Sequence, residues 1–559
     1  MKRINVQKHG LLPGRYRENT LQLRWLLEQQ ENGEETELFF PAGEYHFYPD
    51  YAWEECLCIS NHDEDTLKRV VFLLKNTKNL SILGEDAVFL FHTEEMPFHI
   101  HGCENIRIEG ITIDYDRPTF SEGIIEYVDS RRVVLWIDRK KYPWHIAHER
   151  LFFTGEGFCC ELQFWMEVDR DTYAPVYGTG DMAFAADRPG NYGIWKELGE
   201  DRVEMTLDQE NCSFSAASRK GNQVILRHHP RSAPAFYVTE SRDILLRRVN
   251  VCHALGMGFL AELCEGIELD QFCTTFRPGE KRPCTANADA AQMICCGGKI
   301  HIHHCLFENQ FDDPVNIHGI YVRIHKVLGP CEVIGELVHH QHKGALIGKA
   351  GDTMRLVAKD TMLPVGTGRL EGMERLNRDF VLLRFEQELA GAEAGMALEN
   401  GSRIPDEIVI EHCVMRNNRA RGLLLTQSGK TVVRKNVFQV PGAAILVSGD
   451  CQDWFESGAA GEILVEENLF DCCSYIPNWG KAPIQVEPSA RRTVEGEYYH
   501  QSLTIRRNTF RCFDERLIWA YNLNRLVFQE NSIERTDQYP PIAGERFFLS
   551  HVGEFVEEY

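Results

Sequence analysis

A short strand pattern recurs along this sequence and limits the fold more than any other feature. Each copy has apolar residues, a variable pair, then Asn or Cys, then an apolar doublet. Asn436 follows Cys413 by 23 residues, and Asn531 follows Asn508 by the same step. A fixed period of this length indicates stacked repeats, because one unit alone cannot bury its apolar edge. The copies are HIHHCLF (301–307), VIEHCVM (409–415), VVRKNVF (432–438), LVEENLF (464–470), TIRRNTF (504–510) and VFQENSI (527–533), with looser copies at 106–113 and 245–251.

The repeat consists of strands and turns with almost no helix, which favours an all-β, right-handed parallel β-helix. Asn at the same place in successive coils can form a buried amide ladder that satisfies polar groups inside the stack. Leucine-rich repeats also carry an Asn or Cys position, but their L-x-x-L-x-L spacing is missing here. The steps from Asn436 to Asn468 and from Asn468 to Asn508 are longer, 32 and 40 residues, so those turns carry extra loops.

An N-terminal helix is predicted to cap the stack. Asn19 is a residue type that favours the N-cap position, and Gln22, three residues later, is placed as its capping-box partner. Leu23, Leu26 and Leu27 then form an apolar stripe that ends near Gln30. Two short strands around a Pro-Ala-Gly turn follow.

Two stretches, residues 121–232 and 321–402, lack the repeat pattern and contain alternating strands instead. We expect both to be inserted antiparallel β modules, small barrels or sandwiches, that pack on the helix. Their exposed strand edges make a homodimer plausible. The predicted division is 1–120 for the N-terminal helix and first coils, 121–232 for the first insert, 233–320 for the central coils, 321–402 for the second insert and 403–559 for the C-terminal coils.

Composition excludes several functional classes. The 559 residues carry a formal charge of −23, which argues against a nucleic-acid partner. No run approaches about 18 apolar residues, so no membrane span is expected. The N-terminus has no apolar signal region, which predicts a cytoplasmic location unless an export signal was trimmed. Nineteen cysteines without a CxxC motif indicate reduced, mostly buried thiols.

Three acids, Asp289, Asp312 and Asp313, are the candidate catalytic residues. Asp312 follows Asp289 by 23 residues, one repeat length, so coil stacking should bring the three carboxyls together. Clustered carboxylates repel one another, and at least one should have a raised pKa. Inverting glycosidases need this difference, since one carboxyl donates a proton while another activates water. The alternatives are a solvated Asp-Asp turn or a calcium site, for which the ligands are few.

Four further residues are candidate sugar contacts: His318, His253, Glu262 and Arg323. Each could instead be an ordinary strand residue. Trp165 could stack on an apolar sugar face. His301 and His303 share a strand face but lack a third ligand, so no metal is predicted. No cofactor is predicted either, since the chain has no phosphate-binding loop. Because Arg323 is the cation near the acids in sequence, a neutral sugar is favoured over a uronate.

Four segments resemble glycoside hydrolase family 110, the exo-α-1,3-galactosidases of the pectin-lyase-like β-helix superfamily. They are FPAGEYHFYPD (40–50), CHALGMGFLAE (252–262), ADAAQ (288–292) and CLFENQFDDPVNIHGIYVRI (305–324). Asn287-Ala288-Asp289 with Asp312-Asp313 also resembles the polygalacturonase pattern.

The resemblance implies an oligosaccharide substrate with terminal α-1,3-linked galactose, linear or of the branched blood-group-B type, and inversion at the anomeric carbon. It makes Asp289, Asp312 and Asp313 the catalytic acids. The similarity to polygalacturonases makes Asp312 the proton donor and gives Asp289 and Asp313 the role of positioning water. The alternatives are a polygalacturonase-like hydrolase of uronate glycans and a non-catalytic, carbohydrate-binding β-helix protein.

Overall fold

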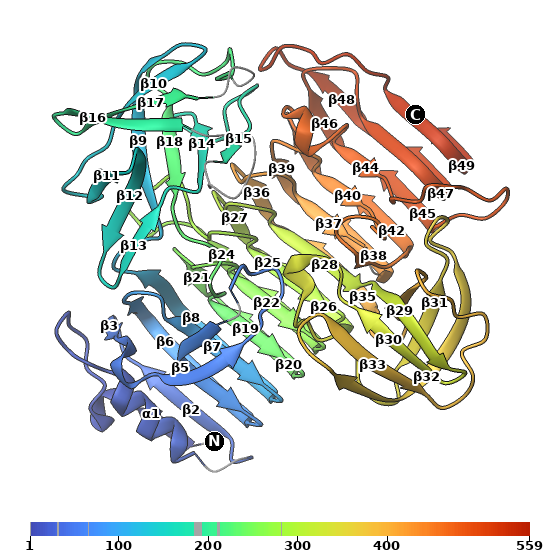
Figure 1. Cartoon of the computed structure of the whole chain (residues 1–559), viewed down its shortest axis with the longest axis horizontal. Coiled ribbons are helices and arrows are strands. Elements are labelled where there is room, and N and C mark those ends of the chain that lie inside the picture. The colour runs from blue at the N-terminus through green and yellow to red at the C-terminus, as the bar shows by residue number, and fades with distance from the viewer. Residues whose placement is uncertain are drawn as a thin grey trace.

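The main body of the molecule is a stack of β coils whose strands pair in parallel from one coil to the next (Figure 1). The computed structural model describes residues 2–30, 33–64, 66–183, 193–208, 213–280, 282–426 and 428–558. In the C-terminal coils β35 (Pro405–Glu411), β38 (Ser428–Arg434), β42 (Ala460–Glu466) and β45 (His500–Arg506) lie side by side, each in parallel register with the next. The predicted parallel β-helix is confirmed.

The repeated Asn residues form the predicted ladder. The backbone N–H of Cys413 donates to Asn436 Oδ1, and the same contact runs from Asn436 to Asn468 and from Asn468 to Asn508, each at 2.9 Å. The amides also bond one another, with Asn436 Nδ2 3.0 Å from Asn468 Oδ1. The last rung is Asn531, whose Oδ1 accepts from the backbone of Asn508. These bonds satisfy polar backbone groups at this position of the C-terminal coils.

Aromatic side chains stack beside the ladder because the repeat ends each copy with a buried apolar residue. The ring centroids of Phe438 and Phe470 are 5.1 Å apart, and those of Phe470 and Phe510 are 4.7 Å apart. All three side chains are buried. The periodic sequence therefore produces a periodic core, which continues through the whole stack.

The N-terminal helix α1 (Thr20–Glu28) covers the first coils with Leu23 and Leu26 buried. Asn19 precedes it as predicted, but its side chain makes no cap hydrogen bond to the helix, so the predicted capping box is wrong. Glu18 accepts from the backbone N–H groups of Thr20 and Leu21 at 2.6 and 3.1 Å instead. Asn19 instead bonds neighbouring segments of the same chain: its side chain accepts from the backbone N–H of Leu12 and donates to the carbonyl of His46.

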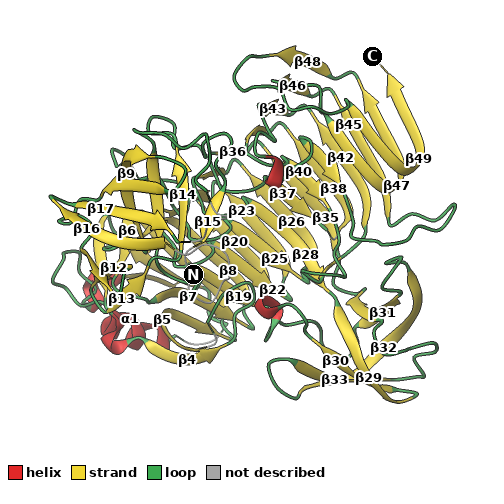
Figure 2. Cartoon of the chain, turned by 45° about the horizontal axis from the view of Figure 1, so that its top comes forward, coloured by secondary structure: helices red, strands yellow, loops and turns green. Residues whose placement is uncertain are grey.

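Two antiparallel modules interrupt the stack and project from it (Figure 2). The first contains a seven-stranded sheet and a separate three-stranded sheet. Trp165 is 1% exposed in its core, so the predicted sugar-stacking role of that residue is wrong. The sheet of seven runs β15 (Asp181–Ala183), β14 (Phe164–Val168), β18 (Gln223–Arg227), β9 (Phe120–Val128), β10 (Arg132–Trp136), β17 (Arg202–Leu207) and β16 (Gly193–Gly199); the other is β11 (Trp144–Ala147), β12 (Arg150–Gly155) and β13 (Phe158–Glu161).

The second module is a closed six-stranded barrel. It begins directly after the central coil strand β28 (Val315–Ile320), and the chain leaves it to enter β35. In the described part of the chain no helix is long and apolar enough to cross a membrane. The barrel order is β29 (Val322–Gly329), β30 (Glu332–Glu336), β33 (Phe380–Phe385), β32 (Pro364–Arg375), β31 (Thr353–Val357) and β34 (Ala397–Asn400).

Candidate active site

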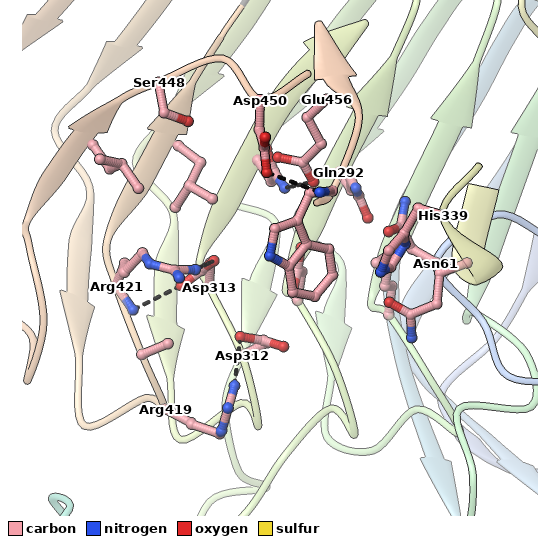
Figure 3. Close-up of a pocket in the computed structure, with 18 of the residues that line it drawn as sticks. Asn61, Gln292, Asp312, Asp313, His339, Arg419, Arg421, Ser448, Asp450 and Glu456 are labelled. Carbon is pink, nitrogen blue, oxygen red and sulfur yellow. Dashed lines mark hydrogen bonds and ion pairs between the residues drawn. The ribbon is translucent and has the colours of Figure 1, made fainter. Parts of the chain in front are cut away.

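A pocket of about 770 Å³ lies where the coil stack meets both inserted modules. The central coils contribute the three predicted acids, and the C-terminal coils contribute Trp454 and Trp479. The first insert supplies Phe164 and Arg227, and the segment 339–341 comes from within the second insert. This volume is in the range of small-ligand sites. Figure 3 shows Asp312 and Asp313 on one side of the pocket, beside Arg419 and Arg421.

Coil stacking brings the three acids together. Strand β25 (Ala291–Ile294) pairs in parallel with β28, and Ala291 faces Val315. The backbone N–H of Ala290 also donates to the carbonyl of Asp313 at 2.9 Å, so Asp289 lies beside Asp313. One carboxylate oxygen from each of Asp289, Asp312 and Asp313 lies within 4.8 Å of the other two. The predicted convergence is confirmed, with a coil step one residue longer than the 23 predicted.

Three arginines that the sequence reasoning missed hold two of these acids. Asp312 Oδ1 lies 2.9 Å from Arg419 Nη1, and its Oδ2 is bonded to Arg231. Asp313 Oδ1 accepts from the backbone N–H of Arg421 at 2.7 Å, and its Oδ2 lies 3.3 Å from Arg421 Nη1. The positive charges of these guanidinium groups therefore offset the negative charges of Asp312 and Asp313.

Burial and the neighbouring charges shift the pKa values of the three acids in different directions. Burial opposes ionisation of Asp312, but Arg419 and Arg231 outweigh it and hold the pKa of Asp312 below its usual value. Burial raises the pKa of Asp313 to about 7, against the attraction of Arg421. Burial and then the charges of Asp312 and Asp313 raise the pKa of Asp289 well above its usual value. The set therefore combines one carboxyl whose pKa is lowered with two carboxyls whose pKa values are raised.

Two of the predicted sugar contacts, His253 and Glu262, are buried inside the stack and do not line the pocket. His253 Nδ1 bonds the carbonyl of Thr285 at 2.8 Å, and its Nε2 accepts from the backbone of Thr119 at 3.0 Å. Glu262 accepts from Ser60 Oγ and from the backbone N–H of Leu346. Both fix the packing between coils and neighbouring loops.

The other two, Arg323 and His318, also lie outside the pocket lining. Arg323 begins the barrel and pairs with Glu336 at 2.7 Å, so it is not the cation beside the acids. Arg231, Arg419 and Arg421 lie beside the acids instead, so the expectation that Arg323 is the nearby cation is wrong. His318 is fully buried behind the pocket wall, with its Nε2 2.6 Å from the Gln292 amide nitrogen.

The missed arginines come from segments far away in sequence. Arg231 lies on the connection from β18 back to the coils, at the boundary of the first insert. Arg421 is 108 residues from Asp313, yet it lies one coil away, because β27 (Leu306–Glu308) pairs with β36 (Val414–Arg416). Most of that separation is the second insert. Stacking coil 403–425 directly on coil 301–320 in the sequence would have revealed the contact.

Comparisons with known proteins agree with this architecture. Residues 121–234 match the family model of GLAA-B beta-barrel domain I, and residues 332–392 match that of GLAA-B beta-barrel domain II. The chain is 30% identical to an alpha-1,3-galactosidase B of Bacteroides thetaiotaomicron, over 90% of this chain and 81% of the relative. It is 30% identical to an alpha-1,3-galactosidase B of Phocaeicola vulgatus, over 96% and 91%. An alpha-1,3-galactosidase A of Shewanella woodyi is 29% identical, over 96% and 87%.

Proposed function

Because this chain belongs to the α-1,3-galactosidase family of glycosidases, we propose that it releases terminal α-1,3-linked galactose from oligosaccharides with inversion at the anomeric carbon. The observation that carries the mechanism is the set of three carboxyls within 4.8 Å, which differ in protonation at neutral pH. The substrate is linear Galα1-3Gal, the branched blood-group-B type, or both.

The reaction is a single displacement. One carboxyl donates its proton to the glycosidic oxygen, and the bond from that oxygen to the anomeric carbon breaks. A second carboxyl takes a proton from a water on the opposite face of the sugar, and the water oxygen forms the new bond to carbon. The site returns to its starting protonation when the second carboxyl releases the proton it took from water and the donor takes one up, either directly or through solvent.

Which carboxyl donates the proton and which activates water depends on which of them is protonated before the reaction. The similarity to polygalacturonases makes Asp312 the donor, but Arg419 and Arg231 hold the pKa of Asp312 below its usual value. The pKa values of Asp289 and Asp313 are raised, so these two carboxyls hold a proton more readily than Asp312 does. For Asp312 to donate, a proton must reach it from these neighbours as the substrate weakens its arginine contacts. For Asp313 or Asp289 to donate, no such transfer is needed.

A neutral galactose fits the charges of the pocket. Arg231, Arg419 and Arg421 are each paired with a site carboxylate. Trp454 lines the pocket with 48% of its surface exposed and provides an apolar face for a sugar ring.

Arg227 supports the second candidate, a hydrolase of uronate glycans. It lines the pocket, and its Nε has no hydrogen-bond partner among the described residues. Its guanidinium lies 4.3 Å from the centroid of the Phe164 ring. A substrate carboxylate in the pocket could pair with this group.

The experiment is a release assay on Galα1-3Gal, the fucosylated B trisaccharide, Galα1-4Gal, Galα1-6Gal and a digalacturonide, with the Asp313→Asn variant as the inactive control. We expect release from one or both α-1,3 substrates, with β-galactose as the first anomer in proton NMR. Preferential release from the digalacturonide would establish the second candidate. α-Galactose as the first product would overturn the single displacement.

A further inference from the structure

A second cluster of ligand-type side chains lies behind the wall of the pocket. His318 is on β28, and Glu456 is on β41 (Glu456–Ser457), which pairs with the end of β28. His342 ends the 3-10 helix η3 (His340–His342), which belongs to the second insert. The cluster therefore joins the central coils, the C-terminal coils and the barrel module.

Several polar atoms in this cluster lack a partner. Among the described residues neither ring nitrogen of His342 has a hydrogen-bond partner, although the side chain is fully buried. Gln292 Oε1 and Asn316 Oδ1 are likewise buried with no partner in the described part of the chain, and both residues line the pocket next to Glu456. Leaving a buried polar atom unsatisfied costs about 1–3 kcal/mol, so several such atoms together indicate a missing ligand.

The spacing and orientation of the cluster fit a metal ion. The ligand atoms of His318, His342 and Glu456 lie within 4.8 Å of one another, and His318 Nε2 is 3.7 Å from Glu456 Oε1. Bonds of about 2.0–2.1 Å to a tetrahedral ion place ligand atoms about 3.4 Å apart, so the side chains need to move only slightly. His318 Nδ1 bonds the carbonyl of Gly319 at 2.8 Å, which orients Nε2 toward the cluster as in many metal-binding histidines.

We propose that His318, His342 and Glu456 bind a divalent transition-metal ion of the Zn²⁺ class. Two imidazoles and one carboxylate suit Zn²⁺ and not Mg²⁺ or Ca²⁺, which prefer all-oxygen ligands. Gln292 supplies the fourth ligand by rotating its amide, so that Oε1 replaces the nitrogen that now lies 2.6 Å from His318 Nε2.

The bound ion would have a structural role beside the pocket. Glu456 and Gln292 both line the pocket (Figure 3), so fixing them fixes that part of its wall. The ion would also tie η3 of the second insert to the two coils beneath it. No step of glycoside hydrolysis is assigned to it, and the proposal stands whether or not the substrate is an α-1,3-galactoside.

A second His-acid cluster provides a matched control. Glu268, His301 and His303 also have ligand atoms within 4.8 Å of one another. Here the histidines already have partners, since His303 Nε2 lies 3.2 Å from Glu268 and His301 Nε2 lies 3.0 Å from Glu411. The first cluster contains a histidine without hydrogen-bond partners among the described residues, whereas both histidines of the second have partners, so the two can be compared in one chain.

The test is a titration of the chelator-treated full chain with Co²⁺, followed by the visible absorption bands of tetrahedral cobalt. We expect one equivalent to bind in the wild type and in His303→Ala, and Zn²⁺ to displace it. In His342→Ala and Glu456→Gln the affinity should fall by about 100-fold or more, since even losing a partner of a metal ligand costs 10–100-fold.

The Glu456→Gln variant keeps the test decisive if circular dichroism shows that His342→Ala is unfolded. Absence of a saturable cobalt spectrum in the wild type would overturn the proposal. So would unchanged binding in a folded cluster variant, or loss of binding in His303→Ala.

Discussion

The Asn ladder and the acid pocket are built by the same stacking of coils, but they place opposite kinds of groups next to each other. In the ladder each amide meets a complementary amide and backbone group, as between Asn436 and Asn468. In the pocket stacking sets Asp289 beside Asp312 and Asp313, so like charges meet. Coil geometry therefore determines which residues are neighbours, and the identity of those residues decides whether the contact stabilises the fold or creates reactive groups.

The two regions also differ in how their polar groups are balanced. Ladder residues are satisfied by neighbours of their own kind, one coil away. The acids are balanced by arginines from other parts of the chain. Arg231 follows the first insert, and Arg421 lies on the coil after the second. The inserts therefore separate these arginines from the acids along the sequence, although the folded chain brings them together.

The largest predicted effect comes from the acid side of this comparison. Asp313→Asn should lower kcat by about 10³-fold, in the range for loss of acid or base catalysis. Folding should be retained, because the change removes a buried charge. The measurement is galactose release at saturating disaccharide, with thermal unfolding in parallel. Asp86→Asn is the control, an exposed residue whose φ of 55° suits Asn equally well. A kcat of Asp313→Asn within tenfold of wild type would remove this residue from the mechanism.

The ladder side should show the reverse behaviour. Asn468→Leu removes the acceptor for Asn436 and the donor to Asn508 and to the carbonyl of Val433. Leaving these buried groups unpaired should reduce the free energy of unfolding by about 3 kcal/mol. The activity of the folded fraction should be unchanged. Urea unfolding and active-site titration measure the two quantities, and a normal stability with a reduced kcat would contradict the separation of the two regions.

How much the sequence predicts differs between these regions for a physical reason. The ladder repeats one residue type at one coil position, so Asn508 and Asn531 are found from spacing alone. The acids are found because Asp289 lies one repeat before the Asp pair. Arg421 is hidden, because the second insert separates it from Asp313 by 108 residues. His253 and Glu262 looked like site residues, but hydrogen bonding inside the stack uses both.

A pH series would sharpen the electrostatic half of the comparison. Asp313 has a pKa of about 7 in the folded protein, above its value in the unfolded chain, so between about pH 4 and 7 the folded state binds more protons. The free energy of unfolding should therefore fall as pH rises through this window, and kcat/KM should fall above pH 7 as the site loses a proton.

Three variants test the source of this dependence. Asp313→Asn should remove its contribution to the slope of stability against pH, whereas Asn468→Leu should leave that slope in place. Arg421→Gln removes the cation that favours ionised Asp313, so the fall in kcat/KM should move to higher pH. A fall at lower pH in Arg421→Gln, or a wild-type kcat/KM that rises through pH 7, would contradict this assignment of the proton.

The smallest predicted effect lies at the open end of the ladder. Asn531 accepts from the backbone N–H and Nδ2 of Asn508 and donates to the carbonyl of Ile505, but it is only partly buried. In Asn531→Ala water can take over these bonds, so the loss should be about 1 kcal/mol, the net value of an ordinary hydrogen bond. Asn468→Ala makes the same truncation where water has no access, and its loss should be two to three times larger. Urea unfolding measures both losses. Equal losses in the two variants would show that each rung stabilises the ladder to the same extent whether or not water is excluded. The contrast with the acid pocket, which depends on that exclusion, would then not hold.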